Sequence, residues 1–135
     1  MRRTLLACTL SLVALTCCGQ PDAGVVAHAG SVKELDPAQL SAMLKSPGVF
    51  VYDCNEEDMH AEAHVPGAKL MVYDEVTADK LPADRNATLV FYCYSPECPA
   101  AASAARAAVA LGFTTVYCMA AGITGWQDAG LPTEP

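Results

Sequence analysis

The sequence contains few basic residues and no long apolar segment. Its 135 residues include 8 Lys and Arg against 15 Asp and Glu, which gives a formal net charge of −7 at pH 7. Because an acidic surface repels phosphate backbones, this balance argues against nucleic acid as a partner. No apolar run approaches the roughly 20 residues that a membrane-spanning helix needs, so a membrane-spanning chain is not expected either.

Charged residues of both signs are scarce, at 17%, whereas hydrophobic residues make up 53% of the chain. This composition is typical of a folded protein and argues against a disordered one. The length fits one ordinary domain and does not leave room for two.

The first 18 residues are typical of a targeting signal. A short basic start precedes an apolar run over residues 5–15, which matches the roughly 7–15 residues of a signal-peptide core. The order Leu-Thr-Cys-Cys at residues 15–18 resembles the bacterial lipoprotein processing site, in which a cysteine becomes the lipidated N-terminus. Cys18 fits that role better than Cys17. A plain secretory signal with incidental cysteines is the alternative.

These features divide the chain into three parts. We expect a signal peptide with a lipoprotein-type processing site at residues 1–18, a polar tether at 19–30 and one folded domain at 31–135. Either form of the signal predicts export to the cell envelope or periplasm. With lipidation, the acyl-bearing cysteine is expected to anchor the protein to a membrane without any segment that spans it.

The expected domain contains four cysteines, Cys54, Cys93, Cys98 and Cys118. In an oxidising compartment four thiols can pair in three ways, and the sequence does not choose among them. A zinc site is not expected, because Cys-x4-Cys is not a common zinc spacing and the histidines lie elsewhere. We therefore expect no metal and no other cofactor.

Short apolar runs alternate with helix-like stretches from residue 31 onward. Strands are expected at 32–35, 49–54, 70–73, 88–92 and 115–119, helices at 37–44, 56–63, 100–111 and 122–129, and a helical turn with a loop at 74–86. This alternation is typical of an α/β fold, with a parallel sheet covered by helices on both faces. Eight alanines between residues 100 and 110 predict a helix that approaches the sheet closely.

The loop after residue 92 is the expected site, because chemistry in an open parallel sheet is found at the carboxyl ends of the strands. Cys93 ends a buried strand, and a helix begins a few residues later. That position surrounds a thiolate with unpaired backbone N–H groups and the positive end of a helix dipole. A buried, inert cysteine is the alternative, and it fits Cys54 and Cys118 better than Cys93.

Three stretches are similar to motifs of the rhodanese-like domains, a family of sulfurtransferases. They are Asp-Cys-Asn at 53–55 with His-Val-Pro-Gly-Ala at 64–68, the strand and cysteine at 89–93, and Gly-Ile-Thr-Gly-Trp at 122–126 with Gly-Leu-Pro at 130–132. The resemblance implies a single rhodanese-like domain with a five-stranded parallel sheet. It implies that Cys93 is the nucleophile and passes through a persulfide, with a small sulfur donor and a thiol acceptor as partners. It also implies structural roles for His64 and Trp126.

The loop departs from the common sulfurtransferase pattern, Cys-Arg-x-Gly-x-Arg or Thr. Residues 93–98 read Cys-Tyr-Ser-Pro-Glu-Cys, so both cationic positions are lost and Glu97 adds a negative charge. Asn55 replaces the arginine of the family's first motif. Binding of a dianion such as thiosulfate is therefore expected to be weaker here than in an arginine-bearing loop. The lack of an arginine six residues after Cys93 also argues against a phosphatase.

Cys98 is the second candidate catalytic residue, because its sulfur is expected to lie close to that of Cys93. It is interpreted either as a thiol that resolves a persulfide or sulfenic acid by forming a disulfide, or as part of an inert disulfide or helix start. Tyr94, Ser95 and Glu97 are the expected substrate-binding residues. The backbone amides of this loop are expected to hold the persulfide.

Four charged or polar residues outside the loop also give expectations. Asp53 ends its strand and is expected to support neighbouring loops through hydrogen bonds to backbone amides, with a solvated carboxylate as the alternative. Arg106 is expected to pair with a surface acid. His60 and His64 are expected on a solvated helix face.

The sequence supports three functions. The leading one is an exported rhodanese-like sulfurtransferase or sulfane-sulfur carrier that acts through a Cys93 persulfide. The second is a thiol–disulfide redox module that uses Cys93 and Cys98. The third is a catalytically silent rhodanese-fold module that binds a partner.

Overall fold

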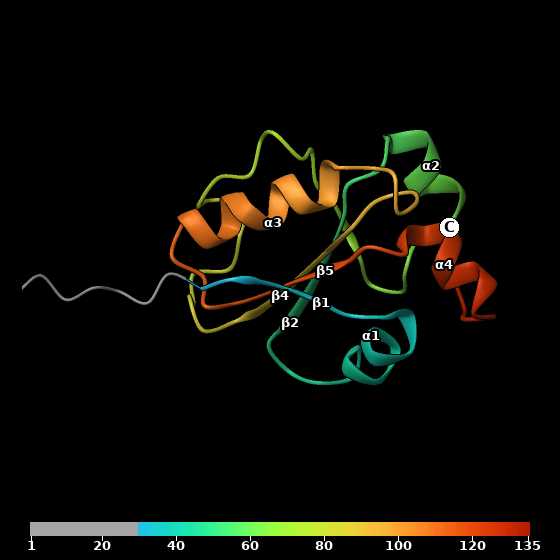
Figure 1. The fold of residues 1–135 in the computed structure, drawn as a ribbon, viewed down its shortest axis with the longest axis horizontal. Helices are drawn as coiled ribbons and strands as arrows, with labels where there is room; N and C mark the ends of the chain where they lie inside the picture. The colour runs from blue at the N-terminus through green and yellow to red at the C-terminus, as the bar shows by residue number, and fades with distance from the viewer. Residues whose placement is uncertain (1–29) are drawn as a thin grey trace, which may run out of the picture.

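Five strands form the central sheet of residues 30–135, the part of the chain that the computed structural model describes (Figure 1). The strands are β1 (Val32–Glu34), β2 (Val49–Asp53), β3 (Lys69–Leu70), β4 (Thr88–Tyr92) and β5 (Thr115–Met119); the helices are α1 (Pro37–Met43), α2 (Glu57–Glu62), α3 (Ala100–Ala110) and α4 (Gly122–Asp128). All strand pairs are parallel, in the order β1-β5-β4-β2-β3. The expected five-stranded parallel sheet is thus confirmed. The expected signal peptide, Cys18 and almost all of the tether lie outside the described residues.

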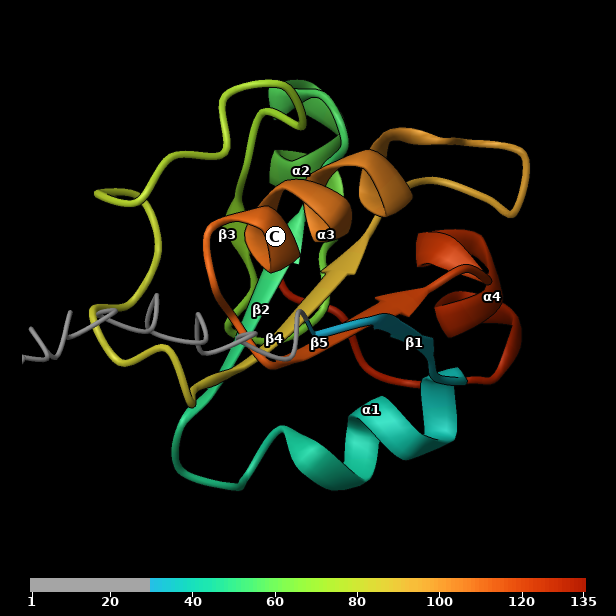
Figure 2. The same ribbon diagram turned by 60° about the vertical axis from the view of Figure 1, so that its left-hand side comes forward.

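Helices cover both faces of the sheet (Figure 2). Along β4 the side chains alternate, so that Leu89 and Phe91 face one side and Val90 and Tyr92 face the other. The first side is packed against α3, and the second is packed against α1 and α4, whose Trp126 is fully buried. Because the inner strands β2, β4 and β5 are largely buried on both faces, their continuous apolar runs follow from the fold.

The alanines of α3 let this helix lie close to the sheet, as its composition predicts. Five of them are buried: Ala100, Ala101, Ala104, Ala105 and Ala108. With only a methyl group to accommodate at each position, the helix backbone packs directly over the strand that leads to the site. No helix among residues 30–135 is long and apolar enough to cross a membrane.

Two segments differ from the sequence-based expectation. The strand expected at 70–73 comprises only Lys69–Leu70, because the chain turns away from the edge of the sheet after Met71. The segment 74–86 contains turns but no helix. Leu81 is its single buried side chain, so it has no apolar face for a helix to pack on the domain.

Candidate functional site

Cys93 directly follows β4, the central strand, at the carboxyl edge of the sheet. In the pairing of β2 with β4, Asp53 lies beside Tyr92. Cys54 and Cys93 therefore leave adjacent strands side by side, and the Cys54 N–H donates to the Tyr92 carbonyl at 2.8 Å. The Cys93 side chain is only 5% exposed. The candidate nucleophile thus lies at the carboxyl ends of the parallel strands, where active sites are found in open α/β sheets.

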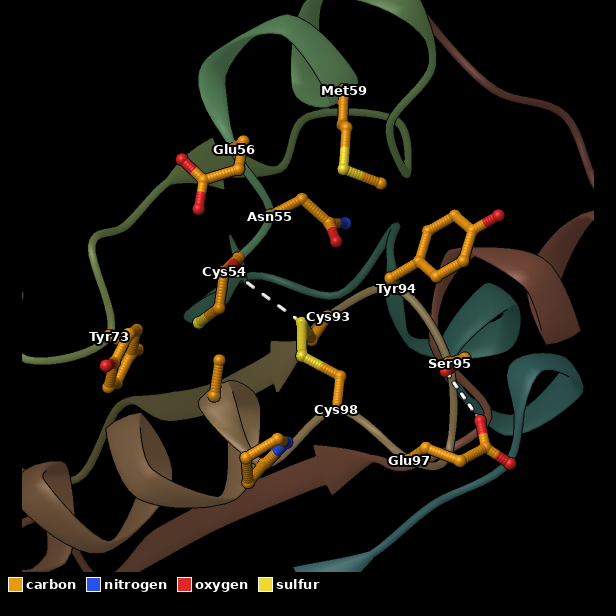
Figure 3. A pocket seen from close by; sticks show the side chains of 12 residues that line it. Cys54, Asn55, Glu56, Met59, Tyr73, Cys93, Tyr94, Ser95, Glu97 and Cys98 are labelled. Atoms are coloured by element: carbon orange, nitrogen blue, oxygen red, sulfur yellow. Dashed lines mark hydrogen bonds between the residues drawn. A yellow bond between two sulfur atoms is a disulfide. The ribbon is translucent and has the colours of Figure 1, made fainter.

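A disulfide joins Cys93 to Cys98 across the loop, with the two Cα atoms 6.3 Å apart (Figure 3). Of the pairings open to the four cysteines, this one leaves Cys54 and Cys118 as free, buried thiols. The Cys93 sulfur lies 3.8 Å from the Cys54 carbonyl oxygen. The structure thus brings together the two residues that the sequence offered as catalytic.

The start of α4 holds the backbone of the loop in place. The Ile123 N–H donates to the Cys93 carbonyl at 2.9 Å, and the Thr124 N–H donates to the Tyr94 carbonyl at 3.1 Å. Gly122 permits this approach, because its φ is +66° and a Cβ there would overlap the Tyr94 carbonyl. Sequence reasoning treated this glycine only as part of a motif and missed its contact with the loop.

Hydrogen bonds within the loop limit which amides can reach a ligand. The prolines at positions 96 and 99 have no N–H to offer. The Cys98 N–H donates to the Ser95 carbonyl at 3.0 Å, which closes a turn. Of the loop amides expected to hold a persulfide, those of Tyr94, Ser95 and Glu97 remain after Cys98 is set aside.

The disulfide borders a pocket of about 610 Å³, within the range of about 300–1,000 Å³ that is usual for small-molecule sites. Tyr94, Ser95 and Glu97, which the sequence offered as substrate-binding residues, all line it. The other lining residues are Cys54, Asn55, Glu56, Met59, Tyr73, Cys93, Cys98, Pro99 and Ala100. The contributions of Met59 and Tyr73 were not expected, because both belong to segments that are distant from the loop in sequence.

The charged side chains that line this pocket are both carboxylates, those of Glu56 and Glu97. The Ser95 hydroxyl donates to Glu97 Oε2 at 2.7 Å, and this hydrogen bond lowers the pKa of Glu97 and keeps it anionic. Asn55 donates through Nδ2 to Asp53 Oδ1 at 2.7 Å, which leaves its amide oxygen for the pocket. The pocket therefore presents acceptors and negative charge where an arginine-bearing loop would present donors.

The two free thiols are held in the protonated form. Burial, followed by the charge of Asp53 and the proximity of Cys118, raises the pKa of Cys54 to about 12. Burial and then the charge of Glu34 raise the pKa of Cys118 as well. Both residues match the interpretation of buried, unreactive cysteines.

Asp53 is fully buried, so the alternative of a solvated carboxylate is wrong. It accepts hydrogen bonds from the Tyr92 hydroxyl at 2.8 Å and from His60 Nδ1 at 2.9 Å. It also accepts from the Asn55 N–H at 2.9 Å, as expected of a residue that supports a loop. The Tyr92 hydroxyl accepts in turn from the Val65 N–H at 3.1 Å. One carboxylate thus connects β2, β4 and α2 beneath the site.

His60 and His64 are half-buried, so the expectation of a solvated face is wrong for this pair. His60 turns inward because it reaches the buried carboxylate of Asp53, and its ring stacks on that of His64 with centroids 3.9 Å apart. His64 Nδ1 donates to the His60 carbonyl at 2.8 Å, and its backbone pairs with Glu134 near the chain end. His64 lies outside the pocket lining.

Trp126 and Arg106 also lie outside the pocket lining. The indole N–H of Trp126 donates to the Pro132 carbonyl at 2.8 Å and ties the last residues to α4. Arg106 donates to the Ser103 hydroxyl at 3.1 Å, one turn earlier on the same helix, so the expected pairing with a surface acid is wrong. Among residues 30–135, no three His, Cys, Asp or Glu side chains cluster in a way that could hold a metal ion.

A parallel α/β domain with a cysteine pair at the end of its central strand defines the class of protein. The family comparison agrees, since the model for the rhodanese-like domain matches residues 36–129, which is more than half of the chain. The chain therefore belongs to the rhodanese-like domain family. Among curated proteins, none matches the sequence.

Solved structures of related proteins have the same fold. A Bacillus halodurans protein is 27% identical, with a TM-score of 0.68 and 76% of each chain covered. A Pseudomonas aeruginosa thiosulfate sulfurtransferase is 28% identical, with a TM-score of 0.66, and the match covers 78% of this chain and 20% of that one. The rhodanese-like domain of an Anabaena protein is 20% identical, with a TM-score of 0.66 over 77% of this chain and 80% of that one.

Proposed function

We propose that the protein is a sulfane-sulfur transferase in which Cys93 carries the sulfur as a persulfide and Cys98 can discharge it. The observation that carries this proposal is the Cys93–Cys98 pair at the carboxyl end of β4, where both residues line the pocket. Membership of a family that includes sulfurtransferases supports the same reaction class.

The reaction begins with reduction, because a disulfide-bonded Cys93 has no thiolate. An external thiol pair donates two electrons and two protons to the Cys93–Cys98 disulfide and leaves as its own disulfide. The Cys93 thiolate then attacks the outer sulfur of a persulfide donor, R–S–SH, which gives Cys93–S–SH and releases R–S⁻. The start of α3 lines the pocket beside Cys93, and its N–H groups and dipole stabilise the anionic sulfur.

The persulfide has two routes of discharge. A thiol acceptor can attack the outer sulfur, which transfers that sulfur and regenerates the Cys93 thiolate. Alternatively the Cys98 thiolate attacks the inner sulfur, the Cys93–Cys98 disulfide forms, and the outer sulfur leaves as HS⁻. The Cα separation of 6.3 Å supports the second route, since the pair lies within bonding range.

A thiol–disulfide redox module is the second candidate, and the same disulfide favours it. In that case the pair would exchange electrons with an external dithiol or peroxide and would never hold an extra sulfur. The two candidates share the reduced form and differ only in what reacts with it.

We also propose that the protein acts in the cell envelope, anchored through a lipid on Cys18. The support is the basic start, the apolar run and the Leu-Thr-Cys-Cys order at residues 15–18. An envelope location gives the cysteine pair an oxidising compartment, so a dedicated thiol reductant becomes part of the cycle.

Intact-protein mass spectrometry separates the candidates. The reduced and desalted protein is treated separately with an organic persulfide, inorganic polysulfide, thiosulfate and mild peroxide, beside Cys93→Ser and Cys98→Ser variants. We expect the Cys98→Ser variant to gain one sulfur atom and the Cys93→Ser variant to gain none. Loss of two hydrogens in the unmodified protein, with no sulfur gain in any variant, would instead establish the redox module. No change with any reagent would leave a silent binding module.

A further inference from the structure

The charge and hydrogen-bonding character of the pocket beside Cys93 identify the kind of molecule that reacts there. We propose that the pocket selects thiols and persulfides whose carbon chain carries an ammonium group, that is, cationic aminothiols. The inference rests on the proposed function for the transfer of sulfur, whereas the binding preference follows from the pocket alone.

The pocket offers acceptors from both of its sides. Glu97 lines it from the loop, with its carboxylate turned toward Ser95 and away from the disulfide, and Glu56 lines it from the segment before α2 (Figure 3). Asn55 lies between that segment and Cys93 and contributes its amide oxygen, because Asp53 engages its nitrogen (Figure 3). An ammonium group has three N–H donors and no acceptor, so it is complementary to this set.

Cationic side chains are missing from the described lining of the pocket. It includes no lysine or arginine. The Ser95 hydroxyl, which could donate to an anion, already donates to Glu97. A dianion would therefore meet two carboxylates of the same sign and would depend on the backbone N–H groups of the loop and of the start of α3, together with the tyrosine hydroxyls.

The walls suit the rest of an aminothiol. Tyr73 and Tyr94 lie on opposite sides of the disulfide, and their side chains are 47% and 49% exposed (Figure 3). Aromatic faces attract an ammonium group placed within about 6 Å of the ring centre. Met59 and Ala100 add apolar surface along which a short carbon chain can lie. At about 610 Å³ the pocket is far larger than an inorganic sulfur anion requires.

With such a ligand, sulfur transfer to Cys93 and sulfur transfer from Cys93 are both balanced reactions. The Cys93 thiolate takes the outer sulfur of an aminothiol persulfide and releases the aminothiolate. In the reverse sense a free aminothiolate accepts the outer sulfur from Cys93–S–SH. The same aminothiol can reduce the Cys93–Cys98 disulfide through a mixed disulfide, two aminothiols being oxidised to one disulfide for each pair reduced.

The rate at which small thiols reduce the Cys93–Cys98 disulfide tests this preference without requiring sulfur transfer. The probes are cysteamine, 2-mercaptoethanol and mercaptoacetate, which are cationic, neutral and anionic. Each rate is divided by that of the same thiol with bis(2-hydroxyethyl) disulfide, which removes differences in intrinsic reactivity. At low ionic strength we expect the normalised rate to fall about threefold to fivefold at each step from cation to anion. The differences should shrink as salt is added.

Charge-neutral variants locate the effect in the pocket. Glu97→Gln and Glu56→Gln should each reduce the cation preference about twofold to threefold. Glu57→Gln is the matched control, since this carboxylate is next to Glu56 and exposed but does not line the pocket. Equal normalised rates for the three thiols would overturn the inference, and so would an effect of Glu57→Gln as large as that of Glu56→Gln.

The outcome also separates this inference from the proposed function. If cationic thiols reduce the disulfide faster but Cys93 gains no sulfur from any donor, the inferred ligand class is supported and the proposed transferase function is rejected. If Cys93 persulfide forms equally fast from cationic and anionic donors, and the normalised reduction rates are also equal, the transferase function is supported and the inferred ligand class is rejected.

Discussion

A single buried carboxylate, Asp53, connects the segments that surround the cysteine site. It accepts hydrogen bonds from the side chains of Tyr92, His60 and Asn55. Burial and then the Asp53 charge raise the pKa of Tyr92, so its hydroxyl stays a donor at any physiological pH. Asp53, Tyr92 and His60 therefore support the site from outside the pocket lining, and Asn55 joins them to the pocket itself.

Replacing this carboxylate tests its contribution to stability. Asp53→Ala should lower the free energy of unfolding by about 2–4 kcal/mol, because buried donors lose their acceptor. Denaturant unfolding measures the loss. The matched change Asp128→Ala, at the exposed end of α4, should stay within about 0.5 kcal/mol. Similar losses in the two variants would contradict the role given to Asp53.

The two buried thiols should react differently from the loop pair. In the reduced protein at pH 8, iodoacetamide should modify Cys93 and Cys98 first, because Cys54 has a pKa raised to about 12 and is protonated. Between pH 8 and the pKa, the modification of Cys54 should accelerate about tenfold per pH unit with its thiolate fraction. Peptide mass spectrometry gives the order, and simultaneous labelling of Cys54 and the loop pair at pH 8 would refute it.

Among the elements, β4, α3 and the position of the loop between them were predictable, although the disulfide within the loop was not. An unbroken apolar strand, a cysteine loop and an alanine-rich helix closed by Gly112 are all local signals, and the predicted bounds of α3 are correct to within one residue. The short β3 was not predictable in length, because an edge strand ends where its pairing ends and not where its apolar residues end.

The contact of α4 with the loop cannot be predicted from local sequence patterns. It consists of backbone hydrogen bonds between residues about thirty positions apart, and a backbone N–H has no sequence signature. The glycine at 122 was the one available signal, but positive φ and a close approach cannot be told from composition. The inward turn of His60 was missed for a similar reason, since it depends on Asp53 of another strand.

Substituting the glycine tests the contact of α4 with the loop. Gly122→Ala should cost stability through its positive φ and through overlap with the Tyr94 carbonyl, and it should slow the reactions of Cys93. Gly130→Ala is the control, because its φ of +68° is similar but open space surrounds it. We expect about 1 kcal/mol from the backbone conformation alone in the control, and at least about 2 kcal/mol in Gly122→Ala. Equal losses with unchanged reactivity would show that the overlap is relieved elsewhere.

At the scale of the whole molecule, the pocket is assembled from three separate stretches of chain. Residues 54–59, Tyr73 and residues 93–100 meet only through the sheet order. From the sequence one could therefore predict that the cysteine loop forms one wall of the pocket, and that this wall lacks the positive charge of the family's arginines. The opposite wall, formed by residues 54–59 and Tyr73, could not be predicted. The pairing of Cys93 with Cys98 likewise depended on the fold, since four cysteines alone allow three pairings.

The proposed location makes a prediction for the full chain. Cys18→Ser should move the protein from the membrane fraction to the soluble fraction, because the proposed anchor is a lipid on this residue. Cell fractionation with radioactive palmitate labelling measures both effects. Cys17→Ser is the matched control and should keep the label. A protein that stays soluble and unlabelled with Cys18 intact would point to a plain secretory signal.

The direct test of the central claim is a single-turnover measurement on the reduced protein with a limiting persulfide donor. We expect Cys93–S–SH to form first, and the Cys93–Cys98 disulfide and free sulfide then to appear together in equal amounts. In Cys98→Ser the persulfide should persist and no sulfide should be released without an added thiol. Disulfide formation without any sulfide, together with no persulfide in Cys98→Ser, would contradict the account and leave a redox pair on a rhodanese-like fold.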